Sequence, residues 1–246
     1  EGDYLKSDQM RELTHQLALA PVEGQWQVAI LDHFEMATAG AANALLKTLE
    51  EPPPNVVLVL LAQEAEALLP TITSRCQILA LRVLSRTLIE RALVERWDVP
   101  QDQARLLSHM CSGRLGWAVA AATTPQVLER RTQRCDDLVK LLYSQRTDRF
   151  MYAEGLARQS TGVILEHLEL WSSWWRDLLL LKTSSPVPLT NLDRQAELTR
   201  LASQLDIMAI HSTLVALQNT MGQLALNTNP RLALEILFLD VPFLIS

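Results

Sequence analysis

The sequence contains few cysteines, and their spacing does not suit cross-links. Cys76, Cys111 and Cys135 are the three in a chain of 246 residues, an odd number without Cys-x-x-Cys spacing. Neither a disulfide framework nor a zinc site is therefore indicated. Because no signal peptide is recognisable at its start, we expect the chain in the reducing cytoplasm.

Long hydrophobic runs and an excess of positive charge are also lacking. The longest apolar runs, such as VVLVLLA at 56–62, fall far short of the ~20 residues that a membrane span requires, so no membrane contact is expected. The 22 Lys and Arg residues are outnumbered by 28 Asp and Glu, which gives a net charge of −6. This balance argues against a protein that grips nucleic acid by bulk electrostatics, and any DNA contact would be shared with partners.

Motifs of independent catalysis are missing as well. The sequence has no G-x-x-x-x-G-K-[ST] loop to cradle phosphate, no H-E-x-x-H and no G-x-S-x-G. The five histidines show no ligand-spaced cluster. The chain itself is therefore expected to hold neither a nucleotide nor a metal.

The first third of the chain contains strand and helix patterns. WQVAILD (26–32) and NVVLVLLA (55–62) are strand-length apolar runs, and CQILAL (76–81) is a third candidate. Such runs suit strands covered on both faces of a parallel sheet. Small and apolar residues at helical spacing in 37–51 predict a helix between the first two strands, and Pro52 should end it. This is a β-α-β unit, whose crossover should be right-handed.

After about residue 83 only helical patterns follow. Three short helices are expected at 84–97, 100–111 and 115–122, the second with Pro100 at its first position. Longer amphipathic helices follow, at 125–143, 148–159, 161–182, 193–204, 206–226 and 230–240, with a loop at 183–191. The expected fold is α/β followed by all-α, with boundaries near 83 and 124.

The helix before Pro52 ends in two glutamates, Glu50 and Glu51. The helix dipole is negative at that end, so each carboxylate costs roughly 0.3 to 1 kcal/mol. Something other than local stability placed them there. We regard both as candidates for contacts with another subunit.

Two further stretches have competing interpretations. Asp32 ends the first strand and could hold Mg²⁺ at the edge of the sheet or simply cap a turn. WSSWWRDLLLL places Trp171, Trp174 and Trp175 on one helical stripe. Such a stripe is usually core, although tryptophan is also enriched in protein interfaces, so these residues are interface candidates.

Arg75, within TSRC, precedes the third candidate strand. An arginine in this place is ordinarily a solvated surface residue. The alternative is an arginine finger presented to the nucleotide of a neighbouring subunit.

Five stretches taken together resemble a known family: DQMREL (8–13), VAILDHFEMATAGAANALLKTLEEPP (28–53), TSRC (73–76), WWRDLL (174–179) and NTNPRLALE (227–235). They are similar, in the same order, to the delta prime subunits of the bacterial DNA polymerase III clamp loader. The resemblance covers nearly the whole chain. It implies a partial AAA+ module at 1–83, a three-helix lid at 84–124 and a helical collar for oligomerisation at 125–246.

The resemblance also implies a role and partners. Members of this family support ATP-dependent loading of the sliding clamp onto primer–template DNA. Their partners are delta subunits and the gamma or tau subunits, which bind ATP and Mg²⁺. Arg75, with Ser74 and Cys76, matches the motif that carries the arginine finger. We expect the chain to be the later part of a longer protein, whose earlier part would hold the Walker A region and, commonly, a zinc module.

Three departures from the pattern of an active ATPase agree with a non-hydrolysing subunit. His33 stands where a motor has its Walker B glutamate, Gln63 where a threonine senses the γ-phosphate, and Gly116 where a second sensor arginine lies. Two alternatives stay open. The chain could be a gamma- or tau-like ATPase with its P-loop outside these residues, or a helical scaffold with a vestigial AAA+ sheet.

Overall fold

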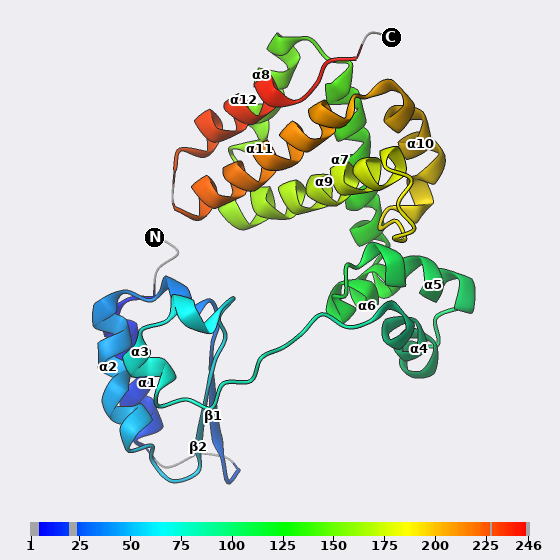
Figure 1. The fold of residues 1–246 in the computed structure, drawn as a ribbon. Helices are drawn as coiled ribbons and strands as arrows, with labels where there is room; N and C mark the ends of the chain where they lie inside the picture. Colours follow the sequence, from blue (N-terminus) through cyan, green and yellow to red (C-terminus); the bar gives the residue numbers. More distant parts are fainter. Residues whose placement is uncertain (1–4, 20–23, 227, 245–246) are drawn as a thin grey trace. The chain divides into compact units, whose positions relative to one another are not determined.

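The structure is a computed structural model that describes residues 5–19, 24–226 and 228–244. The chain forms two compact units, Glu1–Leu81 and Arg82–Ser246, which we describe one at a time (Figure 1). The family-like stretch at 227–235 begins one residue outside the described part, at Asn227. Within the described residues, no helix combines the length and hydrophobicity of a membrane span.

The first unit contains the β-α-β arrangement that the sequence predicts. Strands β1 (Gln27–Leu31) and β2 (Val56–Leu60) pair in parallel, with Gln27 opposite Val56 and Leu31 opposite Leu60. Helix α2 (Ala39–Glu50) connects them and begins at Thr38, whose Oγ1 accepts a hydrogen bond from the Ala41 N–H at 3.2 Å. As expected, Glu51 leaves the helical conformation before Pro52 (φ −130°).

The helices of this unit cover one face of the strand pair. Helix α1 (Ser7–Leu17) packs against α2, and the four-residue helix α3 (Pro70–Thr73) contacts α2 in turn. Figure 1 shows all three on the same side of β1 and β2. Their shared core holds Met10, Phe34, Ala41, Ala42, Leu45 and Ile72. Two short 3₁₀ turns complete the unit, at Phe34–Met36 and Ala65–Ala67.

Two details of the sheet correct the sequence prediction. Residues 76–81 are extended but form no strand, because they pair with no other strand in the described part of the chain. The prediction that both faces of the sheet are covered is also wrong for the described residues. Alternate side chains of β1 face solvent, with Val28 61% and Ile30 63% exposed.

The second unit begins with three short helices, as predicted. They are α4 (Arg86–Trp97), α5 (Gln101–Met110) and α6 (Leu115–Thr123), which enclose a small core of their own. Ser85 caps α4 by accepting a hydrogen bond from the Leu88 N–H at 3.3 Å. Pro100 lies one residue earlier than expected, at the N-cap of α5 rather than at its first position.

Six longer helices complete the second unit around the largest hydrophobic core. Their order matches the sequence prediction, with boundaries shifted by up to three residues: α7 (Pro125–Leu142), α8 (Arg146–Leu156), α9 (Thr161–Lys182), α10 (Gln195–Gln204), α11 (Ile207–Ala225) and α12 (Pro230–Asp240). Helix α9 lies against α7, α10 and α11 (Figure 1). A 3₁₀ turn at Leu192–Arg194 leads into α10.

A buried polar network fixes the loop between α9 and α10. Asp177 is fully buried and accepts hydrogen bonds from the backbone N–H groups of Thr190 and Asn191, at 2.9 and 2.7 Å. The Arg131 guanidinium donates to Asn191 Oδ1 at 2.6 Å and to Asp193 at 2.7 Å. The predicted loop at 183–191 is thus confirmed, and its end is held by charged groups that are paired inside the protein.

Candidate functional site

Arg75 lies just beyond the C-terminal end of α3. Pro70 opens this helix at its first position, where a missing backbone N–H costs nothing. Ile72 is 1% exposed and anchors the turn in the core of the first unit. The Arg75 N–H donates to the Ile72 carbonyl at 3.0 Å, so the backbone at Arg75 is fixed by the packing of α3.

The Arg75 side chain forms an ion pair with Glu50, the last residue of α2. Its Nε–H donates to Glu50 Oε1 at 2.8 Å, and Nη2 lies 2.5 Å from the same oxygen. Nη1 donates to the Thr71 carbonyl at 2.9 Å and to Ser74 Oγ at 3.1 Å. All three guanidinium nitrogens therefore contact an oxygen of the first unit.

The pair is accessible to solvent. The Arg75 side chain is 34% exposed and the Glu50 side chain 50%. An exposed pair of this kind contributes only about 0.2 to 1 kcal/mol to stability. That contribution is similar in size to the cost of a carboxylate at the helix C-terminus, so the Arg75 partner accounts for Glu50 at that position. Sequence reasoning named both residues but did not predict their contact.

The neighbours of Arg75 have different environments. Ser74 Oγ accepts from Arg75 and also lies 3.3 Å from the Thr71 carbonyl. Cys76 is half-buried against the core, and burial raises the pKa of its thiol. Glu51 is exposed at the C-cap of α2, and the Arg75 side chain bonds to Glu50, Thr71 and Ser74 rather than to Glu51.

The carboxyl ends of β1 and β2 bring Asp32, His33 and the segment before Gln63 together. The Leu61 N–H donates to the Leu31 carbonyl at 2.9 Å, which places the two strand ends side by side. Asp32 is 71% exposed, and its Oδ1 accepts a hydrogen bond from the His33 N–H at 2.9 Å. This is the geometry of a turn cap, with His33 in the left-handed conformation (φ 49°).

The polar side chains at this edge bond to near neighbours in the chain. No group of three His, Cys, Asp or Glu side chains is placed to hold a metal ion within those ranges. His33 points its Nδ1 to Glu35 at 3.4 Å, and Gln63 is exposed. The imidazole of His33 cannot serve as the anionic base that a carboxylate supplies at this position.

The tryptophan stripe of α9 belongs to the core, which corrects its selection as an interface candidate. Trp171 is 1% exposed, and Trp174 and Trp175 are 0% exposed. The Trp171 indole N–H donates to the Arg134 carbonyl at 2.9 Å, and its ring lies 5.7 Å from that of Phe238. The other helices of this chain cover all three rings, so they offer no surface to a second protein.

Gly116 lies near the start of α6 and is exposed. A Cβ atom built at this position meets no atom within 4 Å. The glycine is therefore not required by packing. A larger side chain would fit here, so packing does not exclude an arginine at this position.

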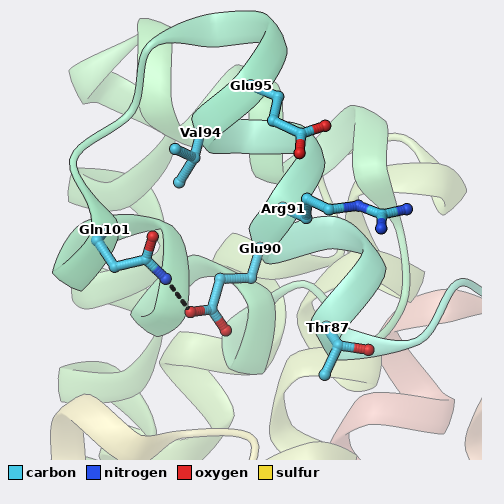
Figure 2. Close-up of a pocket in the computed structure, with 6 residues that line it drawn as sticks. All are labelled: Thr87, Glu90, Arg91, Val94, Glu95 and Gln101. Carbon is cyan, nitrogen blue, oxygen red and sulfur yellow. Dashed lines mark hydrogen bonds between the residues drawn. The ribbon is translucent and has the colours of Figure 1, made fainter.

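A hollow of about 370 Å³ lies beside α4 and the start of α5. Figure 2 shows Glu90 and Gln101 pointing toward one another across it, joined by a hydrogen bond of 2.5 Å, while Arg91 points away. Its charged lining consists of Glu90, Glu95 and Arg91. The net negative charge disfavours a phosphate group, so this hollow does not suit a nucleotide.

Comparison with family models places both ends of the chain in one group. Residues 1–85 match a family described as DNA polymerase III, delta subunit, and residues 125–241 match one described as DNA polymerase III, delta subunit, C terminal. Together the two matches cover most of the chain. They lie on either side of the three short helices α4 to α6.

Curated relatives carry related names. The delta′ subunit of DNA polymerase III from Bacillus subtilis is 32% identical over 154 residues, which are 63% of this chain and 46% of the relative. The delta′ subunit from Haemophilus influenzae is 43% identical over 33% of this chain and 25% of its own length. The tau subunit from B. subtilis is 23% identical over 93% of this chain and 45% of its own. The chain thus spans about half the length, or less, of these relatives.

Proposed function

Because this chain belongs to the DNA polymerase III delta and delta′ family of clamp loader subunits, we propose that it acts as a non-hydrolysing, delta′-like member of a clamp loader. In this role it lends Arg75 to the ATP site of a neighbouring subunit. The neighbour binds ATP and Mg²⁺ and performs the hydrolysis. The assembly uses that energy to place a sliding clamp on primer–template DNA.

The observation that carries this proposal is the placement of Arg75. Its backbone is fixed by a turn that Ile72 anchors in the core, while its side chain is 34% exposed and can be reached from outside the chain. A planar guanidinium can donate two hydrogen bonds to the oxygens of a γ-phosphate as negative charge develops on them. An arginine supplied in trans in this way can accelerate phosphoryl transfer by ~10³ to 10⁵.

The carboxyl edge of the strand pair supports the non-hydrolysing part of the proposal. His33 and Gln63 offer neither an anionic carboxylate nor a hydroxyl sensor, and Asp32 is engaged in capping its own turn. No nucleotide and no metal is therefore assigned to this part of the chain.

The architecture supports a division of labour within the subunit. The β-α-β unit corresponds to part of an AAA+ module, α4 to α6 to a lid, and α7 to α12 to a collar that joins subunits in a ring. The proposed partners are the gamma or tau and delta subunits. Contacts with the clamp and with DNA would pass through the assembly, in the cytoplasm.

A second candidate is an ATPase subunit of the gamma or tau type. The alignment with a tau subunit over 93% of this chain favours it. This candidate requires a phosphate-binding loop outside these residues. It also requires groups that support ATP hydrolysis at the carboxyl ends of β1 and β2. The residues at 33, 63 and 116 favour the first candidate over this one. The third possibility, a scaffold with a vestigial sheet, gives Arg75 no role. The test below distinguishes it from the first candidate.

The test is ATP hydrolysis by a clamp loader reconstituted with the full-length subunit. Replacing Arg75 by Ala should lower clamp- and DNA-stimulated hydrolysis at the adjoining site by ~10³-fold or more. Arg11→Ala is the matched control, because Arg11 is in the same unit and forms an exposed ion pair with Asp8. If both variants hydrolyse ATP like the wild type, Arg75 has no role in trans.

A further inference from the structure

The contact between Glu50 and Arg75 joins two segments that lie 25 residues apart in the chain. Glu50 is the last residue of α2, and Arg75 follows the C-cap of α3. The two helices are held together by the core of the first unit, through Leu45 and Ile72, which are 0% and 1% exposed. The carboxylate and the guanidinium are thus presented to one another by a rigid scaffold.

The contacts divide the guanidinium into two sides. The Nε and Nη2 side lies against Glu50 Oε1. The Nη1 group is held by the Thr71 carbonyl and by Ser74 Oγ. Because a guanidinium is planar, contacts on both sides fix its plane as well as its position.

We propose that Glu50 is the positioning residue for Arg75: it holds the guanidinium in place for an anion that approaches from another subunit. This inference rests on the proposed function of Arg75. Without the carboxylate, the flexible arginine stem is fixed only at Nη1 and samples other rotamers. The entropy of ordering it must then be overcome at each encounter.

The placement of Glu50 supports this role better than a stabilising one. The carboxylate is 50% exposed, so its pair with Arg75 adds little to folding. It also stands at the helix end where a negative charge is unfavourable. Glu51 shares that unfavourable position, but Arg75 bonds to Glu50 and not to Glu51.

The experiment measures single-turnover ATP hydrolysis at the adjoining site of the reconstituted loader, at saturating ATP. Glu50→Ala should lower the rate by about 10- to 100-fold, the usual effect of misplacing a reacting group by about 1 Å. Glu50→Gln keeps an oxygen acceptor for Nε and Nη2, so the Arg75 guanidinium keeps its position although the negative charge is lost. The rate of this variant should stay within about 3-fold of wild type. Asp8→Ala, which breaks the exposed pair with Arg11 in the same unit, is the control and should leave the rate unchanged.

The decisive readout is the coupling between the two residues. In an Arg75→Ala background, Glu50→Ala should have no further effect, because a residue that acts through Arg75 is silent without it. An additional loss in that background would overturn the inference, and so would full activity of Glu50→Ala in the wild-type background. Should the Ala variant melt below the assay temperature, Glu50→Asp, which retracts the carboxylate by one methylene, replaces it in the same cycle.

The outcomes separate this inference from the proposed function. If Arg75→Ala itself leaves hydrolysis intact, the finger is wrong and Glu50 has nothing to position. If Arg75→Ala abolishes hydrolysis while Glu50→Ala does not, Arg75 acts without help from Glu50, and only the present inference fails.

Discussion

At the scale of single residues, burial gives the three cysteines different reactivities. Cys111 and Cys135 are both 0% exposed, whereas Cys76 is half-buried. Burial raises the pKa of Cys135 to about 11 and also raises that of Cys111. Because the thiolate is the reactive form, these two thiols stay protonated and unreactive near neutral pH.

The thiols of the native protein should therefore react in two classes. With Ellman's reagent at pH 7.5, we expect one thiol, Cys76, to react first, and the other two to react only after denaturant is added. The rate at Cys76 should increase as pH rises, because its pKa lies above the ordinary value and more thiolate forms at higher pH. Cys76→Ser should remove the fast phase, and three fast thiols in the wild type would contradict the packing described.

Glu50 and Arg75 illustrate what a residue-level pattern can and cannot predict. The motif around Arg75 predicts a functional arginine. The unfavourable position of Glu50 at a helix C-terminus makes it a candidate for a contact. Their contact was missed because they lie 25 residues apart and share no periodic signal. Only the packing of α3 against α2 brings them together.

At the scale of elements, Arg149 of α8 ties the C-terminal end of α12 to α7. The residue is 5% exposed, and its guanidinium donates to the carbonyls of Leu141, Phe238 and Val241 at 3.0, 3.0 and 2.6 Å. A fourth bond, to the Pro242 carbonyl, is 2.9 Å long. This one side chain thus bonds carbonyls at the C-terminal ends of α7 and α12, where a helix leaves backbone acceptors without i+4 donors.

Replacing Arg149 by Met should lower the free energy of unfolding by about 3 kcal/mol or more, because several buried carbonyls lose a charged donor at once. The check is a denaturant titration, read as a shift of the midpoint at constant slope. Arg158→Met, in an exposed pair with Glu154, is the control and should cost about 0.5 kcal/mol or less. Equal midpoints for the two variants would rule out this role for Arg149.

Helices were predicted from the sequence more accurately than the sheet, for a physical reason. A helix bonds within itself, so the apolar spacing and flanking residues of α9 or α12 suffice to locate it. A strand needs a partner elsewhere in the chain. CQILAL at 76–81 has the composition of a strand but pairs with no strand in the described residues, where Leu79 and Leu81 are 76% and 94% exposed.

At the scale of the whole molecule, the two units differ in architecture and in proposed task. The first carries the strand pair and Arg75, and the second is entirely helical in its described residues. The order of elements and the family could be predicted from the sequence. The buried network of Arg131, Asp177 and Asn191 could not, because its members come from separate segments with no shared spacing.

This chain should bind no nucleotide tightly by itself. Isothermal titration of the chain with Mg-ATP should show no micromolar binding, since its sequence contains no G-x-x-x-x-G-K-[ST] loop to cradle phosphate, and His33, Gln63 and Gly116 depart from the pattern of an active ATPase. His33→Glu should not create hydrolysis, because an orienting carboxylate needs a bound phosphate to act on. Micromolar affinity together with turnover by the isolated subunit would instead favour the ATPase candidate.

The central claim is that Arg75 supplies a planar cation, held in place by contacts within its own unit, to a neighbour's ATP. Arg75→Lys tests it most directly, because lysine keeps the charge and loses the planar guanidinium that these contacts fix. The measurement is clamp- and DNA-stimulated ATP hydrolysis at the adjoining site of the reconstituted loader, beside thermal melting of the subunit. We predict that the Lys variant hydrolyses ATP as slowly as Arg75→Ala and melts within a few degrees of the wild type, because an exposed ion pair contributes only about 0.2 to 1 kcal/mol. Wild-type hydrolysis by the Lys variant, or a large loss of melting temperature, would contradict the account.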